Sequence, residues 1–294
     1  MERVLLHVRI GIKLDAGFSR RDDYRRLFGE RNVLEYLREL GVEAVEAPVL
    51  YETDDDGVLD HARQCSVAGL RVSLHPYSEG TPRNPAFFAP GEDNFCRSLH
   101  ERFLVLGRKI SQLQGSPTVV NIHPAADAGK PRGELVEQSV RFFQWARQWS
   151  QRHGDEVQVV AELQIAPVRG EAMRRIGDRY DELLEVVRRG GVEACWDFGH
   201  AAMNHRRLGD GLDPPEDLLR RVAHVHCHDI HHEDHQPLLF GNVPWPSFLR
   251  QLRSWGFDGT VILEVPVCNF LANGGLDSLV QSVRPLELIQ SDVL

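Results

Sequence analysis

Short apolar runs alternate along the chain with longer segments in which apolar residues recur at helical spacing. The apolar runs, which predict strands, cover residues 4–12, 42–50, 70–74, 118–122, 157–163, 192–196, 222–230 and 260–263. The helical segments cover residues 31–40, 57–68, 94–114, 133–153, 179–189, 215–221, 245–255 and 276–288. Strands that are separated by helices pair in parallel, and eight such units in 294 residues are typical of a (β/α)8 barrel. The sequence therefore predicts an α/β fold, a single (β/α)8 TIM barrel over residues 1–294.

Two further features of the pattern bear on the architecture. A doubly wound open sheet is the alternative arrangement of strands and helices, but no glycine-rich nucleotide turn follows the first predicted strand. The connection over residues 78–93 is rich in Pro, Gly and Asn, and it is too long to be a simple connector. We interpret it as a candidate substrate lid.

Composition restricts the partners and the location that we expect. The net charge is −9 with histidine neutral, which argues against broad attraction to nucleic acid or to an anionic membrane. No apolar run approaches the length of a membrane span. The five cysteines are scattered and form no CxxC pattern, as in reduced cytoplasmic proteins. We therefore expect a cytoplasmic protein without a membrane partner, and the sequence allows a homo-oligomer without specifying one.

The most unusual stretch of the chain runs from Ala223 to His235 and contains six of its 14 histidines. Its first part alternates, so that His224, His226 and His228 share one face of an extended segment. A strand that ends in a loop rich in imidazoles and carboxylates is typical of a metal site. A lone histidine is more often a hydrogen-bonded structural residue, and a histidine tract can bind metal adventitiously at a surface. The metal interpretation therefore depends on ligands from other strands.

Ionisable side chains end nearly every predicted strand from the third onward. In a (β/α)8 barrel the active site lies at the carboxyl ends of the strands, so these side chains would meet there. The set is His75, His123, Glu162, Asp197, His200, His226, Asp229, His235 and Glu264. Each residue alone has an ordinary explanation, such as a helix N-cap for Asp197. Together they would repel or desolvate one another without a cation, and a divalent metal converts that penalty into binding.

These strand ends carry a resemblance to a known family. The motifs, in chain order, are His123-Pro124, Asp197-Phe198-Gly199-His200-Ala201, His226-Cys227-His228-Asp229, Asp234-His235-Gln236-Pro237-Leu238 and Leu263-Glu264-Val265. As an ordered set from about His75 to Glu264, they resemble the xylose isomerase-like TIM barrel superfamily. That superfamily includes the sugar phosphate isomerases and epimerases, and endonuclease IV (AP endonuclease family 2).

The resemblance implies a different metal site in each branch. In the isomerase and epimerase branch, one divalent ion (Mn, Mg, Co or Zn) is held by residues that match Glu162, Asp197, His226 and Glu264. In that branch Glu162 and Glu264 would be the catalytic pair, and we expect substrate contacts at His200, Asp229 and His123. In the endonuclease branch, up to three zinc ions use a larger set that matches His75, His123, Glu162, Asp197, His200, His226, Glu233 or Asp234, His235 and Glu264.

Two departures from the family pattern concern the substrate side. The segment after His235 does not run quickly into Gly-x-Gly, and His228 stands where the family has a lysine before the aspartate. Among the other histidines of the stretch, we expect His224 to lie deeper in the barrel as a hydrogen-bonded core residue. We expect His231 and His232 to be solvated.

The leading hypothesis is a divalent-metal-dependent isomerase or epimerase that acts on a small sugar or sugar phosphate. Glu162 and Glu264 would transfer the proton, and the metal would polarise a carbonyl or hydroxyl. The alternative is a zinc-dependent phosphodiesterase of the endonuclease IV type, acting on abasic DNA. DNA binding needs basic side chains, whereas the rim segments 52–56 and 231–234 are acidic or neutral. A noncatalytic metal-binding barrel is the third hypothesis, and it would not need ligands from so many strands.

Overall fold

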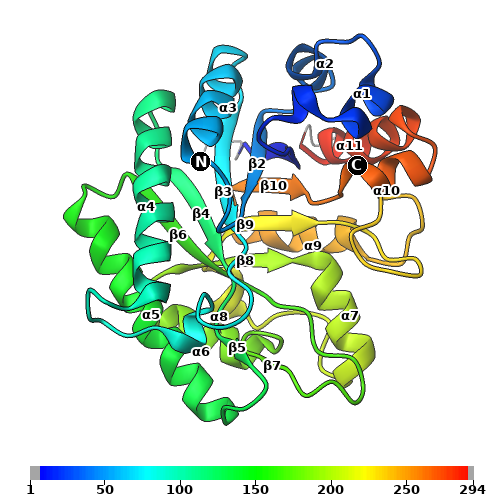
Figure 1. The fold of residues 1–294 in the computed structure, drawn as a ribbon. Helices are drawn as coiled ribbons and strands as arrows, with labels where there is room; N and C mark the ends of the chain where they lie inside the picture. The colour runs from blue at the N-terminus through cyan, green and yellow to red at the C-terminus, as the bar shows by residue number, and fades with distance from the viewer. Residues whose placement is uncertain (1–6, 291–294) are drawn as a thin grey trace, which may run out of the picture.

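A closed barrel of eight parallel strands forms the centre of the molecule, and helices surround it (Figure 1). The computed structural model describes residues 7–290. Around the barrel the strands follow the order β1-β10-β9-β8-β6-β4-β3-β2. Their bounds are β1 (Arg9–Lys13), β2 (Ala44–Val49), β3 (Arg71–Pro76), β4 (Thr118–Ile122), β6 (Val157–Glu162), β8 (Glu193–Asp197), β9 (Val222–Cys227) and β10 (Thr260–Leu263). The predicted (β/α)8 barrel is confirmed, and residues 4–6 of the first predicted strand lie outside the described residues.

Helices connect the strands and cover the outside of the barrel. They are α1 (Asp22–Phe28), α2 (Val33–Glu39), α3 (Asp55–Val67), α4 (Phe95–Gln114), α5 (Arg132–Arg152), α6 (Tyr180–Gly190), α7 (Phe198–Leu208), α8 (Glu216–Leu219), α9 (Trp245–Ser254), α10 (Val267–Ala272) and α11 (Leu276–Gln290), with 3-10 turns η1 (Phe18–Arg20) and η2 (Pro85–Phe87). In α4, Leu99, Phe103, Leu106 and Ile110 form one buried stripe at helical spacing. Within residues 7–290, every helix is too short or too polar to cross a bilayer.

One strand of the barrel contains a β-bulge. Val222 and His224 of β9 pair with two adjacent residues of β8, Ala194 and Cys195, so Ala223 is the extra residue of the bulge. Gly259 lies beside the bulge, and a Cβ at this glycine would be only 2.2 Å from the carbonyl oxygen of Ala223. The bulge therefore requires a glycine at this position. Beyond it, His224 and His226 are both fully buried.

The structure contains elements that the periodicity did not predict, namely the 11-residue helix α7 and several short ones. The helices α1 and α10 have seven and six residues. In α1, arginines and aspartates mask the buried residues Tyr24, Leu27 and Phe28 in the sequence pattern. A short antiparallel ribbon pairs β5 (Ala126–Asp127) with β7 (Arg174–Arg175). Strands of two residues are too short for an alternating pattern to reveal.

The connection over residues 78–93 is partly anchored in the core, so its interpretation as a lid applies only to its exposed parts, residues 79–82 and 89–93. Asn84 is buried, and its side-chain oxygen accepts hydrogen bonds from the backbone N–H of Ala86 (2.9 Å) and of Ala126 (2.8 Å). Phe88 is also buried, with its ring 5.6 Å from that of Phe142 in α5. Residues 84–88 are therefore fixed against α5 and β5, and only residues 79–82 of this segment's first half are exposed.

Candidate metal centre

Every strand of the barrel contributes a polar side chain to the barrel interior. In ring order they are Lys13 (β1), Glu264 (directly after β10), His226 (β9), Asp197 (β8), Glu162 (β6), Asn121 (β4), His75 (β3) and Glu46 (β2). All of them except Lys13 are buried. Buried ionisable groups are stable only when they are paired, hydrogen-bonded or bound to a metal. The partners of each side chain therefore indicate its role.

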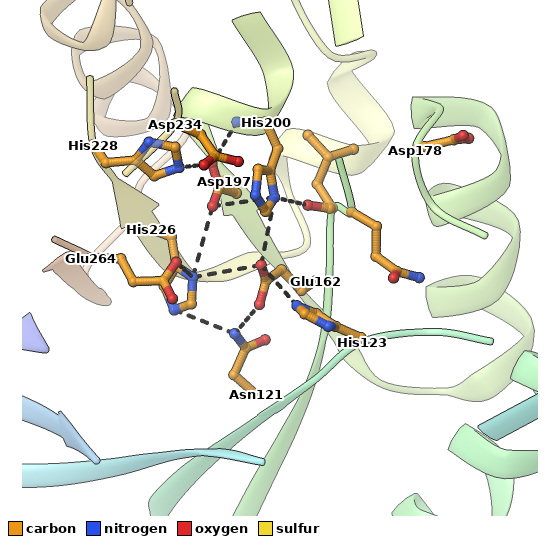
Figure 2. A network of polar contacts seen from close by, with 12 residues as sticks. Asn121, His123, Glu162, Asp178, Asp197, His200, His226, His228, Asp234 and Glu264 are labelled. Atoms are coloured by element: carbon orange, nitrogen blue, oxygen red, sulfur yellow. Dashed lines mark hydrogen bonds and ion pairs between the residues drawn. The ribbon is translucent and has the colours of Figure 1, made fainter. Parts of the chain in front are cut away.

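Four of these side chains converge on one point (Figure 2). His226 Nδ1 lies 2.8 Å from Glu264 Oε2, 3.6 Å from Glu162 Oε1 and 3.9 Å from Asp197 Oδ2. None of these four atoms has a hydrogen-bond partner among the described residues, because even the 2.8 Å contact lacks hydrogen-bond geometry. Buried polar atoms are almost always hydrogen-bonded, so four exceptions at one point need an explanation.

In Asp197 and Glu162, the second carboxylate oxygen is held by a neighbour. Asp197 Oδ1 caps the N-terminus of α7 by accepting a hydrogen bond from His200 N (2.7 Å), and it lies 3.2 Å from His228 Nε2. Glu162 Oε2 accepts a hydrogen bond from the side-chain amide of Asn121. Each carboxylate is therefore fixed through one oxygen and leaves the other oxygen facing the common point (Figure 2).

Glu264 and His226 follow the same rule. Glu264 Oε1 accepts hydrogen bonds from Tyr77 Oη (3.0 Å) and from Lys13 Nζ (3.2 Å), which leaves Oε2 free. His226 Nε2 lies 2.7 Å from Glu46 Oε1, which leaves Nδ1 free. Outer partners that fix one atom of a side chain while the other atom faces inward are the means by which proteins orient metal ligands.

A divalent cation fits this donor set, which consists of three carboxylates and one imidazole. Positive charge on histidines balances the carboxylates. Burial alone would raise the pKa of Glu162, but the imidazoles of His123 and His226 lower it well below its ordinary value. Burial alone would lower the pKa of His226, but the carboxylates of Glu264 and Glu46 raise it well above its ordinary value. A divalent ion would supply positive charge at the same place.

Sequence comparison now identifies the family. The model described as "Xylose isomerase-like TIM barrel" matches residues 34–285. The protein belongs to the xylose isomerase-like TIM barrel family. The resemblance drawn from the strand-end motifs is therefore confirmed. A comparison with curated proteins finds no match.

Solved structures match this xylose isomerase-like barrel over nearly all of its length. A D-psicose 3-epimerase with D-tagatose, from Clostridium cellulolyticum H10, is 14% identical with a TM-score of 0.64, covering 97% of this chain and 99% of that chain. A D-psicose 3-epimerase in the presence of D-fructose is 15% identical with a TM-score of 0.64, covering 95% and 96%. An AP endonuclease, family 2, from Brucella melitensis is 19% identical with a TM-score of 0.61, covering 91% and 99%. At these identities the likeness shows the fold.

Two of the predicted ligand histidines stand beside Glu162. His75 Nδ1 lies 3.0 Å from the carbonyl oxygen of Asn121, to which it donates, and His75 Nε2 is 3.5 Å from Glu162 Oε2. His123 Nε2 is 3.3 Å from Glu162 Oε1. Two ligands of one tetrahedral ion with bonds of ~2.1 Å lie ~3.4 Å apart. These three residues therefore form a second group of metal-ligand geometry beside the central four.

His200 and His235 lie on the other side of the central four. His200 Nδ1 donates a hydrogen bond to the carbonyl oxygen of Leu163 (2.9 Å), so the free nitrogen of this ring is Nε2. His235 Nε2 lies 3.3 Å from Glu264 Oε2. The structure thus brings together the predicted metal ligands and also His200 and His123, for which we expected substrate contacts. The remaining predicted substrate residue, Asp229, lies apart.

His235 has an unusual backbone conformation. Its φ angle is +51°, in the left-handed region, which costs a non-glycine residue about 1–3 kcal/mol. The conformation is held from both sides, because His235 N donates to His228 Nδ1 (2.9 Å) and the His235 carbonyl accepts from Asn269 Nδ2 (2.9 Å). Strain that is held in place by its surroundings is concentrated at functional sites. The side chain that it places is 25% exposed at the edge of the centre.

His228, which replaces the lysine of the family pattern, supports Asp197. Its Nδ1 accepts a hydrogen bond from His235 N (2.9 Å), and its Nε2 lies 3.2 Å from Asp197 Oδ1. Gly199 makes room for this ring, because a Cβ at Gly199 would lie 2.0 Å from His228 Cε1. The glycine of the Asp197-Phe198-Gly199-His200 motif is therefore required by the imidazole of His228.

Asp229 organises a loop, in contrast to the substrate contact that we expected. Its carboxylate oxygens accept five backbone hydrogen bonds of 2.7–3.1 Å, and the side chain is fully buried. The donors are the N–H groups of Ile230, Phe240, Gly241, Asn242 and Val243. These bonds fold back the loop that carries His235. Both oxygens are thereby occupied by backbone donors.

Sequence reasoning missed four residues that orient the central side chains, namely Lys13, Glu46, Tyr77 and Asn121. The available signal was a polar residue inside an apolar strand, as for Glu46 in β2 and Asn121 in β4. Lys13 is one of only three lysines in a chain with 34 basic residues. The expectations for the other histidines agree with the structure. His224 is buried and hydrogen-bonded, and residues 231 and 232 are exposed.

Proposed function

We propose that this protein is a divalent-metal-dependent isomerase or epimerase of a small sugar or sugar phosphate. One ion would be held by Glu162, Asp197, His226 and Glu264. The observation that carries the proposal is that each of these side chains has one polar atom fixed by a neighbour and one unsatisfied atom at the common point. Such an arrangement orients ligands before an ion binds, which lowers the reorganisation needed on binding.

The two glutamates are suited to proton transfer. When bound, a divalent ion polarises a carbonyl or hydroxyl of the substrate and lowers the pKa of the adjacent C–H. Glu162 and Glu264 belong to β6 and to the end of β10, which stand three places apart in the ring of strands. Their free oxygens therefore approach a substrate from different sides. Carboxylates placed in this way suit a reaction in which a proton is removed from one face of a carbon and a proton is added to the other face.

Glu264 also has a source of protons. His235 Nε2 lies 3.3 Å from Glu264 Oε2, and its ring is partly exposed to water. A proton on Nε2 would pass to Oε2 and from there to the substrate carbon, after which His235 would take up a proton from water. Lys13 and Tyr77 remain on Oε1 and keep Oε2 directed at the reacting carbon.

The substrate class follows from charge and from the structural comparisons. The chain carries a net charge of −9, which disfavours a long polyanion and leaves small carbohydrates as the natural class. Two of the matched epimerase structures were solved with D-tagatose or D-fructose. Ketoses of this size, free and phosphorylated, are therefore the first compounds to test.

A second candidate function has a specific observation in its favour. His75 and His123 stand 3.3–3.5 Å from Glu162, and Asp197, His200 and His235 belong to another group of close donor atoms. Adjoining groups of this kind suit a cluster of up to three zinc ions and a phosphodiesterase that acts on abasic DNA. Metal stoichiometry separates this candidate from the first.

The deciding experiment measures metal content and activity in the same preparation. The protein is stripped with a chelator, reloaded with Mn²⁺, Co²⁺, Mg²⁺ or Zn²⁺, and analysed for ions per chain by mass spectrometry. Each form is then incubated in D₂O with D-fructose, D-tagatose and their phosphates, and with an abasic-site duplex. Loss of a sugar C–H signal in the NMR spectrum reports proton abstraction.

We expect about one tightly bound ion per chain and metal-dependent exchange of a sugar C–H for deuterium. The Glu162→Gln variant should lose this exchange, since its amide cannot accept a proton from carbon. Three tightly bound zinc ions with cleavage of the abasic duplex would overturn the isomerase proposal in favour of the second candidate. Failure to bind any divalent ion would overturn both.

A further inference from the structure

A second group of polar side chains lies below the central four, deeper in the barrel. Glu46 of β2, His224 of β9 and Ser73 of β3 are buried and contact one another. Glu46 Oε2 lies 2.8 Å from His224 Nε2 and accepts a hydrogen bond from Ser73 Oγ (3.2 Å). Glu46 Oε1 lies 2.7 Å from His226 Nε2. One carboxylate thus bridges the two imidazoles that β9 directs into the barrel.

Glu46 contacts both imidazoles directly. His224 Nε2 forms a hydrogen bond with Glu46 Oε2 at 2.8 Å, and His226 Nε2 forms an ion-pair contact with Glu46 Oε1 at 2.7 Å. A ring nitrogen this close to a carboxylate oxygen carries a proton, because two unprotonated acceptor atoms would repel each other. The side-chain nitrogen of Asn121 lies 3.3 Å from His226 Nε2, which is farther than Glu46 Oε1 at 2.7 Å. Glu46 is therefore the acceptor for His226 Nε2–H.

We propose that Glu46 is a positioning residue that fixes the ring of His226 and keeps its proton on Nε2, so that Nδ1 is the ligand atom. The inference rests on the proposed function, because it concerns the ion held by the central four. Glu46 is itself fixed by His224 and Ser73, which prevents its carboxylate from turning toward the ion. The negatively charged carboxylate beside Nε2–H also raises the basicity of Nδ1 and strengthens its bond to a cation.

This assignment explains why two histidines stand two residues apart on β9. His226 is the ligand, and His224 supports the carboxylate that orients it. If Glu46 only stabilised the fold, it would not need to contact the metal ligand His226. An apolar residue of similar volume would then stabilise the barrel core equally well. The two roles differ in what happens to the metal site when Glu46 is replaced.

The test uses two variants of the full chain and one control. Glu46→Gln keeps the shape and an acceptor but removes the charge, and Glu46→Leu removes both. The control is Ser73→Ala, which removes a hydrogen bond to Glu46 but leaves the contact with His226. For each protein, zinc affinity is measured by competition with a chromophoric chelator, and the ring nitrogens of the histidines are followed by ¹⁵N NMR with and without zinc.

We expect zinc affinity to fall about 10-fold in Glu46→Gln and about 100-fold in Glu46→Leu, and to change less than about 3-fold in Ser73→Ala. In the wild-type protein, the NMR spectrum should contain one slowly exchanging histidine Nε2–H that is bonded to a carboxylate, and Glu46→Leu should lose it. Unchanged zinc affinity and an unchanged histidine spectrum in both Glu46 variants would overturn the inference. A fall in thermal stability alone, with affinity intact, would also overturn it.

The outcome is separable from that of the proposed function. If the wild-type protein binds no divalent ion, the proposed function fails, and the NMR comparison without zinc still decides whether Glu46 fixes the His226 ring. If the wild-type protein binds one ion and both Glu46 variants bind it equally well, the proposed function stands and the inference fails.

Discussion

The substitution Asp197→Asn tests the central geometry with almost no change in shape. Asp197 Oδ1 accepts a hydrogen bond from His200 N (2.7 Å), so this backbone N–H requires an acceptor at that position. In the variant the amide oxygen must therefore occupy the Oδ1 position. The amide nitrogen is then forced into the Oδ2 position, at the point where Glu162, His226 and Glu264 converge. An amide nitrogen does not ligate a divalent cation.

The expected free-energy change for metal binding is several times larger than that for folding. Asparagine is as good a helix N-cap as aspartate, so α7 loses only a charge–dipole interaction of about 0.3–1 kcal/mol. Changes in outer partners of a metal site weaken binding about 10–100-fold. Removal of a ligand together with its charge should exceed this range, which means at least ~100-fold or about 2.7 kcal/mol.

The assay combines isothermal titration of the stripped protein with zinc or manganese and thermal unfolding of the metal-free forms. Asp178→Asn is the matched control, because Asp178 is also buried but pairs with Arg132 and lies away from the centre (Figure 2). It should leave metal affinity intact. Wild-type affinity in Asp197→Asn would refute the assignment of Oδ2 as a ligand atom, and an equal loss in both variants would indicate a nonspecific effect.

Three further predictions address other parts of the chain. His226→Ala should abolish metal binding and activity, whereas His232→Ala, at an exposed position, should leave both intact in the same titration; equal behaviour of the two variants would contradict the assignment of this stretch. Burial lowers the pKa of His61 to about 4, below the unfolded value of 6.5, so its contribution to stability is complete above pH 6.5 and is lost as the pH falls toward 4. The unfolding free energy of the metal-free protein, measured with urea, should therefore fall between pH 7 and pH 5, and this fall should be about 2 kcal/mol smaller in His61→Leu than in the wild type. The same pH dependence in both proteins would exclude the effect. Asp229→Ala leaves five backbone N–H groups without their acceptor. The amide hydrogens of residues 229–243 should therefore exchange ~100-fold faster or more, while those of the barrel strands keep their protection. Unaltered exchange in residues 229–243 would mean that other contacts fold this loop.

The fold was predictable because a (β/α)8 barrel repeats one simple pattern. Each buried parallel strand is a short apolar run, and each outer helix has one apolar stripe, so the order of elements follows from the sequence. The helices α1 and α10 escaped because they are short, and in α1 charged residues dilute the stripe. The 11-residue α7 escaped because Gly199, His200 and Asn204 interrupt the apolar stripe on its buried face. The anchoring of residues 84–88 escaped because it depends on Asn84 meeting the distant Ala126.

The candidate site was predictable in its ligands and unpredictable in their supports. His226 and Glu264 stand at strand ends, which the barrel rule selects directly. Glu46 stands within a strand and acts from below, so no rule about strand ends finds it. Asp229 stands beside a ligand in sequence, yet its carboxylate is used by a loop that returns from residues 240–243. Such contacts form only when the loop folds back on itself, so the residues next to Asp229 in the sequence do not reveal them.

The bulge at Ala223 determines where β9 can change its length during evolution. Loss of Ala223 would restore one-to-one pairing with β8, while His224 and His226 would keep their partners Thr260 and Ile262 in β10. Loss of Val225 would instead change the parity between the two histidines and place them on opposite faces of the sheet. Insertions and deletions are thus tolerable at the start of this strand and damaging two residues later. Related barrels should therefore vary in length before the first histidine and keep a spacing of two after it.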